Sequence, residues 1–373
     1  MTLILIDATA FVFRAFHAMR PLASPDGVPT GALFGFTQMV LNLVRESGAT
    51  HAAAVFDAPG PSFREEVYAD YKANRPETPE EIRIQIPLCM EFSRLIGLPV
   101  FSETGFEADD IIATLAVKWP SAQDPIVVYS ADKDLMQLVN DRVSLYDPMR
   151  EKWYDKQGVF EKFHVHPGQV GDYLSLVGDA SDNVPGVPGI GARTAAKLLA
   201  EYGSLDGVLE AAAQHPGRIP GRTGETLRTH VEQARLSRRL VTLHMDVPLT
   251  VQLPDGLRIQ PAHREELRVF LQRYGFARLL RELDAVPRSF ARDTRFSGGA
   301  GMQAPPPAET GSSPGEQPKG QAPPSAERPT LWIGVDFARR HPRLFDVGEI
   351  FFCTPAGEKE RCRFADGFLN TGP

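Results

Sequence analysis

The chain has 373 residues, 42% of them hydrophobic, and a formal net charge of −7. This length suits about two domains and a tail, and no apolar run approaches the roughly 20 residues of a membrane span, so no membrane partner is expected. The cysteines, Cys89, Cys353 and Cys362, have neither zinc spacing nor an even count, and Asp7 interrupts the apolar start. We therefore expect a reduced cytoplasmic protein without a signal peptide. The acidic charge argues mildly against nucleic-acid binding, although a site rich in carboxylates would also produce it.

Acidic residues follow the predicted strands of the first part of the chain. The apolar runs predict strands at 3–6, 51–56, near 100 and at 126–129, and helices at 31–46, 111–117 and from about 135. This alternation is typical of an α/β fold with a doubly wound, mainly parallel sheet. The acids that follow the strands are Asp7, Asp57, Glu107, Asp109, Asp110, Asp132 and Asp134. Because functional groups gather at the carboxyl edge of such sheets, we expect these acids to converge there.

Residues 63–83 combine cations with aromatic rings. The cations are Arg64, Lys72, Arg75 and Arg83, and the rings are Tyr68 and Tyr71. Basic residues interleaved with aromatic residues suit a segment that follows single-stranded nucleic acid. A solvated helix face of mixed charge explains the same pattern, so both interpretations stay open for this segment alone.

Residues 178–199 combine acids with a glycine-rich turn. Asp179 and Asp182 are one helical turn apart, which lets both carboxylates point the same way. Gly186, Gly189 and Gly191 follow, and then a helix is predicted from about residue 193 to 199. Amides exposed at a helix N-terminus form an anion site that suits a DNA phosphate. Two alternatives are a structural corner and a dinucleotide fingerprint, and the second lacks the preceding strand that it requires.

The acids together predict a metal site. Nine carboxylates close together would repel strongly at neutral pH unless divalent cations were bound. No histidine or cysteine cluster competes with them, since His164 and His166 are interpreted as loop residues. Oxygen ligands alone favour a hard cation, Mg²⁺ or Mn²⁺.

Several blocks of the sequence resemble a known family. The blocks are LIDATAFVFRAFHA, PTGALFGF, FDAPGPSFREEVYADYKANRP, GFEADDIIATLA, SADKDLMQLV and GDASDNVPGVPGIGARTAAKLL. In sequence, order and spacing they resemble the 5′-nuclease domain of bacterial DNA polymerase I, within the flap endonuclease superfamily. The resemblance covers about residues 1–287. It implies a PIN-like α/β domain with a helical arch, followed by a helical helix–hairpin–helix subdomain.

The resemblance also assigns roles. It implies an inner metal site at Asp7, Asp57, Glu107, Asp109 and Asp110 and an outer one at Asp132, Asp134, Asp179 and Asp182. Lys72 and Arg75 would be catalytic residues of the arch, and Tyr71 would stack on an unpaired base. The DNA-binding set would be Arg64, Tyr71, Gly186, Gly189, Gly191, Arg193, Thr194 and Lys197. Two Mg²⁺ or Mn²⁺ ions are implied. Relatives hold a monovalent cation at the hairpin, and the resemblance suggests K⁺ there.

The implied domain order is a catalytic domain at 1–170, with the arch near 63–83, and a DNA-binding subdomain at 171–287. Residues 204–285 look helical. The Pro- and Gly-rich composition of 288–329 predicts a disordered linker, and 330–373 form a short tail, with a strand-like run at 332–337, rather than a polymerase domain.

The expected function is a structure-specific 5′ nuclease, acting as a 5′→3′ exonuclease and 5′-flap endonuclease in DNA replication and repair. Its partners would be DNA with 5′ flaps or nicks and RNA-primed DNA, and a polymerase would be supplied separately. The resemblance implies a monomer that associates with the nucleoid. A non-catalytic DNA-binding scaffold of the same fold and a PIN-type RNase are the alternatives.

Overall fold

The structure is a computed structural model that describes residues 2–214, 218–285, 350–353, 359–365 and 368–370. The chain divides into two compact units, residues 1–307 and 308–373. Within the described ranges, no helix combines the length and apolar character needed to cross a membrane. The predicted linker at 288–329 and the strand-like run at 332–337 lie outside the described residues.

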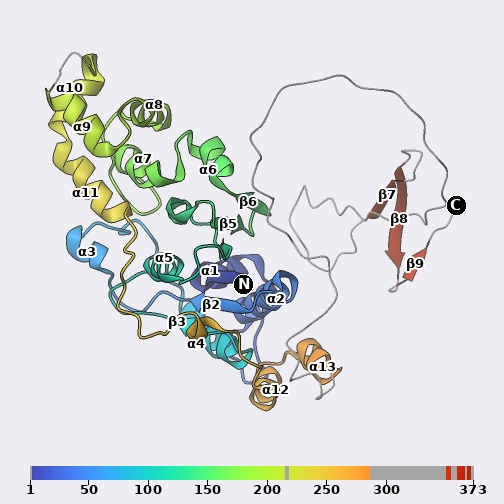
Figure 1. Cartoon of the computed structure of the whole chain (residues 1–373). Coiled ribbons are helices and arrows are strands. Elements are labelled where there is room, and N and C mark those ends of the chain that lie inside the picture. The colour runs from blue at the N-terminus through green and yellow to red at the C-terminus, as the bar shows by residue number, and fades with distance from the viewer. Residues whose placement is uncertain (1, 215–217, 286–349, 354–358, 366–367, 371–373) are drawn as a thin grey trace. The chain divides into compact units, whose positions relative to one another are not determined.

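A six-stranded sheet forms the centre of the first unit (Figure 1). Its strands, in spatial order, are β3 (Val100–Phe101), β2 (His51–Val55), β1 (Leu3–Asp7), β4 (Ile126–Tyr129), β5 (Val143–Asp147) and β6 (Lys152–Tyr154). Neighbouring strands are parallel except for β6, which is antiparallel to β5. The mainly parallel α/β sheet is therefore confirmed. The strand order reverses beside β1, the position at which such sheets place their sites.

Alternate residues of the central strands face two separate hydrophobic cores. In β1, Ile4 and Ile6 belong to one core and Leu3 and Leu5 to the other, and all four are buried. The first core is completed by α1 (Ala8–Ala18), α2 (Gly31–Ser47) and α4 (Glu80–Leu95). The second is completed by α5 (Ala108–Lys118) and by the helical part of the chain. A sheet covered on both faces leaves its strand ends as the place where polar groups can gather.

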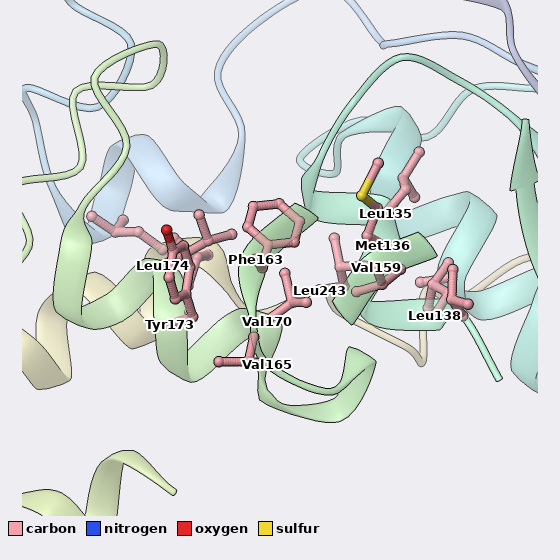
Figure 2. Close-up of a cluster of buried hydrophobic side chains, with 14 of the residues drawn as sticks. Leu135, Met136, Leu138, Val159, Phe163, Val165, Val170, Tyr173, Leu174 and Leu243 are labelled. Carbon is pink, nitrogen blue, oxygen red and sulfur yellow. The ribbon is translucent and has the colours of Figure 1, made fainter. Parts of the chain in front are cut away.

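A helical part joins the sheet through a continuous hydrophobic core. Its helices are α6 (Lys156–Phe163), η2 (Pro167–Gln169), α7 (Val170–Val177), α8 (Ala192–Tyr202), α9 (Leu205–Gln214), α10 (Gly221–Thr229) and α11 (Val231–Val241). Figure 2 shows Phe163 and Val170 near Leu135 and Met136, which lie on the 3-10 helix η1 (Asp134–Leu138). All four side chains are buried in the same core. This packing holds η1, and therefore Asp134, against the helical part.

The chain returns to the sheet after α11, which corrects the prediction that 204–285 is helical throughout. Residues 242–263 have mostly irregular structure, apart from the short 3-10 helix η3 (Asp255–Leu257). The amide of Ile259 donates to the carbonyl of Thr50 at 3.0 Å. Two helices follow, α12 (Arg264–Arg273) and α13 (Ala277–Ala285), and α12 buries Phe270 in the core of α1, α2 and α4. The end of the predicted subdomain 171–287 thus packs on the sheet domain.

The second unit contains a small antiparallel sheet among its described residues. Its strands are β7 (Ile350–Cys353), β8 (Lys359–Ala365) and β9 (Phe368–Asn370), in that order. β8 pairs with both neighbours.

Candidate active site

Asp7 closes β1 at the carboxyl edge of the sheet. Its Oδ1 accepts a hydrogen bond from the amide of Ala10 at 3.1 Å, which caps α1, and its Oδ2 accepts one from Ser130 Oγ at 2.7 Å. The side chain is buried. Burial, together with the carboxylates of Asp57 and Asp132, raises the pKa of Asp7 to about 7. The sequence analysis did not select Ser130, although a serine between a strand and two acids is a recognisable signal.

Asp57 and Asp109 join the same edge from β2 and α5. Asp57 is exposed, and its Oδ1 accepts a hydrogen bond from the amide of Ala108, the first residue of α5, at 2.8 Å. Burial raises the pKa of Asp109 well above its ordinary value, and the carboxylates of Asp132 and Asp7 add to this. Burial is the main cause of the raised pKa values at this edge, and the neighbouring carboxylates add to it. Asp109 thus lies close to Asp7, Glu107, Asp132 and Asp134, as predicted for the strand-end acids, whereas Asp110 does not join them.

Three acids form a compact group where η1 meets the glycine-rich hairpin. Asp134, Asp179 and Asp182 each offer a carboxylate oxygen, and these oxygens all lie within 4.8 Å of one another. Oδ1 of Asp134 is buried without a hydrogen-bond partner among the residues that the structure describes. A buried carboxylate oxygen without a donor is costly unless a cation approaches it. The group therefore fits a hard divalent cation.

Two residues of the segment 69–75 bridge the sheet edge and the hairpin. Lys72 Nζ lies 2.7 Å from Oε1 of Glu107 and 3.8 Å from Oδ2 of Asp182. The hydroxyl of Tyr71 donates to Oε2 of Glu107 at 3.2 Å and to Oδ2 of Asp182 at 3.1 Å. Although burial opposes it, these two carboxylates raise the pKa of Lys72. A cation from one segment therefore neutralises acids from two others.

Further cations face the hairpin acids. Arg75 forms an ion pair with Oδ1 of Asp182, and Lys133 Nζ lies 2.6 Å from Oδ1 of Asp179. Burial acts against it, but the hydrogen bonds from Lys133 and Ser181 lower the pKa of Asp179. Lys133 was missed by the sequence analysis, although it lies between two of the predicted ligands. Its charge alone did not distinguish it from a surface lysine.

Arg64 and Asp110 are corrections to the predicted site. The guanidinium of Arg64 binds the carboxylate of Asp110 with two contacts of 2.7 Å and donates to the carbonyls of Leu240 at 2.7 Å and Thr242 at 3.1 Å. Asp110 also accepts from the amides of Glu107 at 3.2 Å and His244 at 2.8 Å. Arg64 is 2% exposed and Asp110 is 0% exposed, and both have their hydrogen-bonding partners inside the protein. They form a buried structural pair.

Two more expectations change. Tyr71 is only 5% exposed, so its ring does not present a stacking face for a base, and its hydroxyl serves the acids instead. The predicted helical arch is helical only at its ends, in α3 (Phe63–Val67) and from Glu80, whereas residues 69–75 form turns. Lys72 has a positive φ of 55°, and its amide donates to the carbonyl of Asp182 at 3.0 Å. This turn directs Lys72 toward the acids.

The glycines of the hairpin are of two kinds, one buried and two exposed. Gly186 is buried with a φ of 60°, its amide donates to Ser237 Oγ at 3.2 Å, and a Cβ there would overlap the backbone of Gly178 and Val177. Gly186 is therefore structural, which corrects its predicted role in DNA binding. Gly189 and Gly191 are exposed, and no side chain caps α8 at Gly191.

The first turns of α8 carry the remaining predicted DNA contacts. Arg193 and Lys197 are exposed, and Thr194 is half-buried. The uncapped N-terminus and these two cations fit a phosphate. The predicted alternative of a dinucleotide fingerprint finds no support, because α7 and a turn, not a strand, precede these glycines.

Family profiles match most of the described chain. A profile described as the 5′-3′ exonuclease N-terminal resolvase-like domain matches residues 2–164, and one described as the 5′-3′ exonuclease C-terminal SAM fold matches residues 165–265. A 5′-3′ exonuclease of Aquifex aeolicus is 37% identical over 295 residues, which cover 79% of this chain and 99% of that protein. This chain belongs to the 5′-3′ exonuclease family and is a nuclease.

Longer relatives and solved structures agree with this assignment. The DNA polymerase I of Rhizobium leguminosarum is 43% identical over 289 residues, 75% of this chain, but these make up only 28% of that polymerase. A zinc-bound 5′-exonuclease of bacteriophage T5 has a TM-score of 0.57 at 24% identity, over 65% of this chain and 90% of that one. A T5 flap endonuclease solved with DNA and metal ions has a TM-score of 0.56 at 21% identity, over 74% and 100%. These two structures share the fold.

Proposed function

We propose that this chain is a divalent-metal-dependent 5′ nuclease that cuts DNA at 5′ flaps and nicks and removes RNA primers from RNA-primed DNA in replication and repair. The observation that supports this most directly is the meeting of two acid groups, at the sheet edge and at the hairpin, with Lys72 between them. The acids alone would indicate only a metal site. Lys72, which lies beside both acid groups, adds a positive charge that can bind a phosphate.

Two ions of Mg²⁺ or Mn²⁺ are proposed as cofactors. One would be held by Asp134, Asp179 and Asp182, whose oxygens are already close. The other would be held at the sheet edge, with Asp7, Asp57, Glu107 and Asp109 as ligands and Asp132 between the two sets. When bound, two such ions activate a water, orient the phosphate and neutralise the charge that develops on it. A K⁺ at the hairpin, about residues 184–199, is a further proposal by resemblance.

The chain's own cations would act on the substrate once the acids have metal partners. Glu107 and Asp182 hold Lys72, and Asp182 also holds Arg75. Both cations therefore stand beside the acids that would hold the ions. From there Lys72 and Arg75 would stabilise charge on the scissile phosphate. Arg193 and Lys197 would contact the backbone of the duplex.

The cellular setting is proposed from the same chemistry. A DNA polymerase supplied separately is proposed to carry out synthesis after primer removal. We propose a cytoplasmic monomer that works at the nucleoid. A scaffold that binds DNA without cutting it and an RNase of similar fold are the competing functions.

The test uses labelled 5′-flap, nicked, single-stranded and RNA-primed substrates with the purified full-length protein. We expect cleavage with Mg²⁺ or Mn²⁺ and none in EDTA, and a rise in melting temperature on adding either ion without DNA. Asp134→Asn should remove most of this rise. The change in melting temperature therefore measures metal binding independently of cleavage activity. A protein that binds flap DNA but never cuts it is the scaffold, and one that cuts only single-stranded RNA is the RNase.

A further inference from the structure

A groove beside the candidate active site lies between α3 and the end of α11. It has a volume of about 510 Å³, within the range of ligand sites in proteins. Its lining residues are Phe63, Val67, Arg235, Arg238, Arg239, Thr242, Leu243 and His244. Figure 1 shows α3 next to the end of α11 that leads into residues 242–263. None of these residues takes part in the acid cluster.

The groove combines an aromatic wall with cations. The ring of His244 packs edge-on against Phe63, with centroids 6.1 Å apart, and against Phe106 at 5.2 Å. Leu243 is buried beneath, and His244 is exposed. This arrangement presents flat, apolar surface to solvent without any acidic side chain among the lining residues.

The three arginines differ in their partners. Arg238 lies 2.8 Å from Oδ2 of Asp206, and Arg235 lies 3.0 Å from Oε1 of Glu232. In the described ranges, no carboxylate lies within ion-pair distance of Arg239, which is exposed. A guanidinium beside an aromatic wall and without a carboxylate is typical of sites that bind phosphates and bases together.

The groove is held in shape by the buried pair described above. Arg64 points from α3 toward Asp110 and also donates to the carbonyls of Leu240 and Thr242, which end α11. One guanidinium thus fastens both walls. The amide of Phe63 donates to the carbonyl of Gly105 at 2.9 Å, two residues before Glu107. The groove is therefore preformed. Through this hydrogen bond, its wall residue Phe63 is connected to the segment that carries the candidate metal ligand Glu107.

We propose that this groove binds single-stranded nucleic acid of the substrate's 5′ strand, with a base against Phe63 and His244 and a phosphate at Arg239. The proposal rests on the proposed function and names a second place at which the flap is held, apart from the acids and the hairpin. Phe63 packs against Phe106, which directly precedes the candidate metal ligand Glu107. Because the groove is thus close to the candidate active site, its occupant is expected to be the substrate strand and not a protein ligand. An acidic peptide is the other anion that the cations could attract.

The test measures the affinity of the full-length protein for 5′-flap DNA with flaps of increasing length, in EDTA so that nothing is cut. The variants are Arg239→Gln and Phe63→Leu, the second of which keeps the apolar volume. Arg94→Gln is the control, because Arg94 is also exposed and lies on α4, outside the residues that line the groove. A fluorescein-labelled glutamate-rich peptide and a labelled oligothymidylate serve as separate ligands.

We expect long flaps to bind the parent protein and the control more tightly than one-nucleotide flaps. Phe63→Leu should lose at least about fivefold affinity for long flaps, since one stacked base contributes that much or more. Arg239→Gln should lose a comparable amount through its phosphate contact. Both should bind short flaps normally in EDTA and cut them normally once Mg²⁺ is added, so the result is independent of whether the proposed nuclease function holds. Equal dependence on flap length in all variants overturns the proposal. Peptide binding that Arg239→Gln abolishes, with flap binding unchanged, also overturns it. Should Phe63→Leu fail to fold, Arg239→Gln alone decides.

Discussion

Lys72 and Glu107 form an ion pair that connects three segments of the chain, with Nζ 2.7 Å from Oε1. Lys72 lies in the turns after α3, Glu107 precedes α5, and the same ammonium is 3.8 Å from Asp182 in the hairpin. The pair is 35 residues apart in sequence. The acids predicted to bind metal are thus paired with a side chain predicted to be catalytic.

Lys72→Ala should lower the single-turnover rate of flap cleavage by about 10²–10³-fold, the usual loss when one preorganised charge at a reacting phosphate is removed. The affinity for flap DNA should change little, because a contact made mainly in the transition state affects turnover and not binding. Rapid mixing at saturating enzyme measures the rate, and fluorescence anisotropy measures the affinity. A loss of affinity with a normal saturated rate would show that Lys72 only binds DNA.

The matched comparison for Lys72 is the double variant Arg193→Ala with Lys197→Ala on α8. Both side chains are exposed on the hairpin helix, away from the acids. We expect weaker binding and a salt dependence whose logarithmic slope falls by about 1–2, since fewer counterions are released. The saturated cleavage rate should stay near normal. An unchanged slope would place the duplex elsewhere on the protein.

Asp7→Asn should make the metal-free protein more stable, and the gain should grow as the pH rises from about 4 to 7. Burial raises the pKa of Asp7 from 3.8 to about 7 in the folded protein. Over this interval the unfolded chain loses the proton before the folded chain does, so ionisation favours unfolding until the pH exceeds the folded pKa. The gain at neutral pH should be roughly 1–4 kcal/mol. Urea unfolding in EDTA at several pH values measures it, and a pH-independent difference contradicts the argument.

Arg64→Leu should reduce the free energy of unfolding by about 3–5 kcal/mol, because it leaves the buried carboxylate of Asp110 without its partner. Arg75→Leu is the control, since the Arg75 side chain is 48% exposed in its ion pair with Asp182. The control should cost less than about 1 kcal/mol. Urea titrations compare the two. If Arg64→Leu is stable and instead loses affinity for DNA, then Arg64 is a DNA contact, as the sequence analysis expected.

Gly186→Ala should be far more destabilising than Gly189→Ala, although both glycines have positive φ values, of 60° and 74°. At Gly186 a Cβ meets the backbone of Gly178, whereas at Gly189 nothing lies within 4 Å. Strain alone costs about 1–2 kcal/mol at Gly189, and overpacking adds at least another 1–3 kcal/mol at Gly186. Thermal unfolding measures both. Similar melting temperatures for the two variants would mean that the close approach of Gly178 and Gly186 relaxes easily.

Local sequence patterns predicted the sheet and much of its acidic edge. The strands β1 and β4 begin and end within one residue of the predicted limits, because buried parallel strands are short apolar runs that stand out against their surroundings. The position of Asp7 and Asp57 at one edge followed from strand direction alone. The helical prediction failed at residues 242–263, where the chain crosses back to the sheet. Its hydrogen-bond partners there, such as Thr50, are distant in sequence.

The sequence by itself therefore determined the family, the mainly parallel sheet and the pool of acids from which a metal site is built. Only the tertiary structure decided the role of each member. Asp109 and Asp110 are neighbours in sequence, yet Asp110 turns inward to Arg64 while Asp109 joins Asp7 and Asp132. Successive residues at the start of a helix point about 100° apart, and their partners come from segments tens of residues away. Packing of α3 and α11 against α5, and not residue type, separates the structural carboxylate from the candidate ligands.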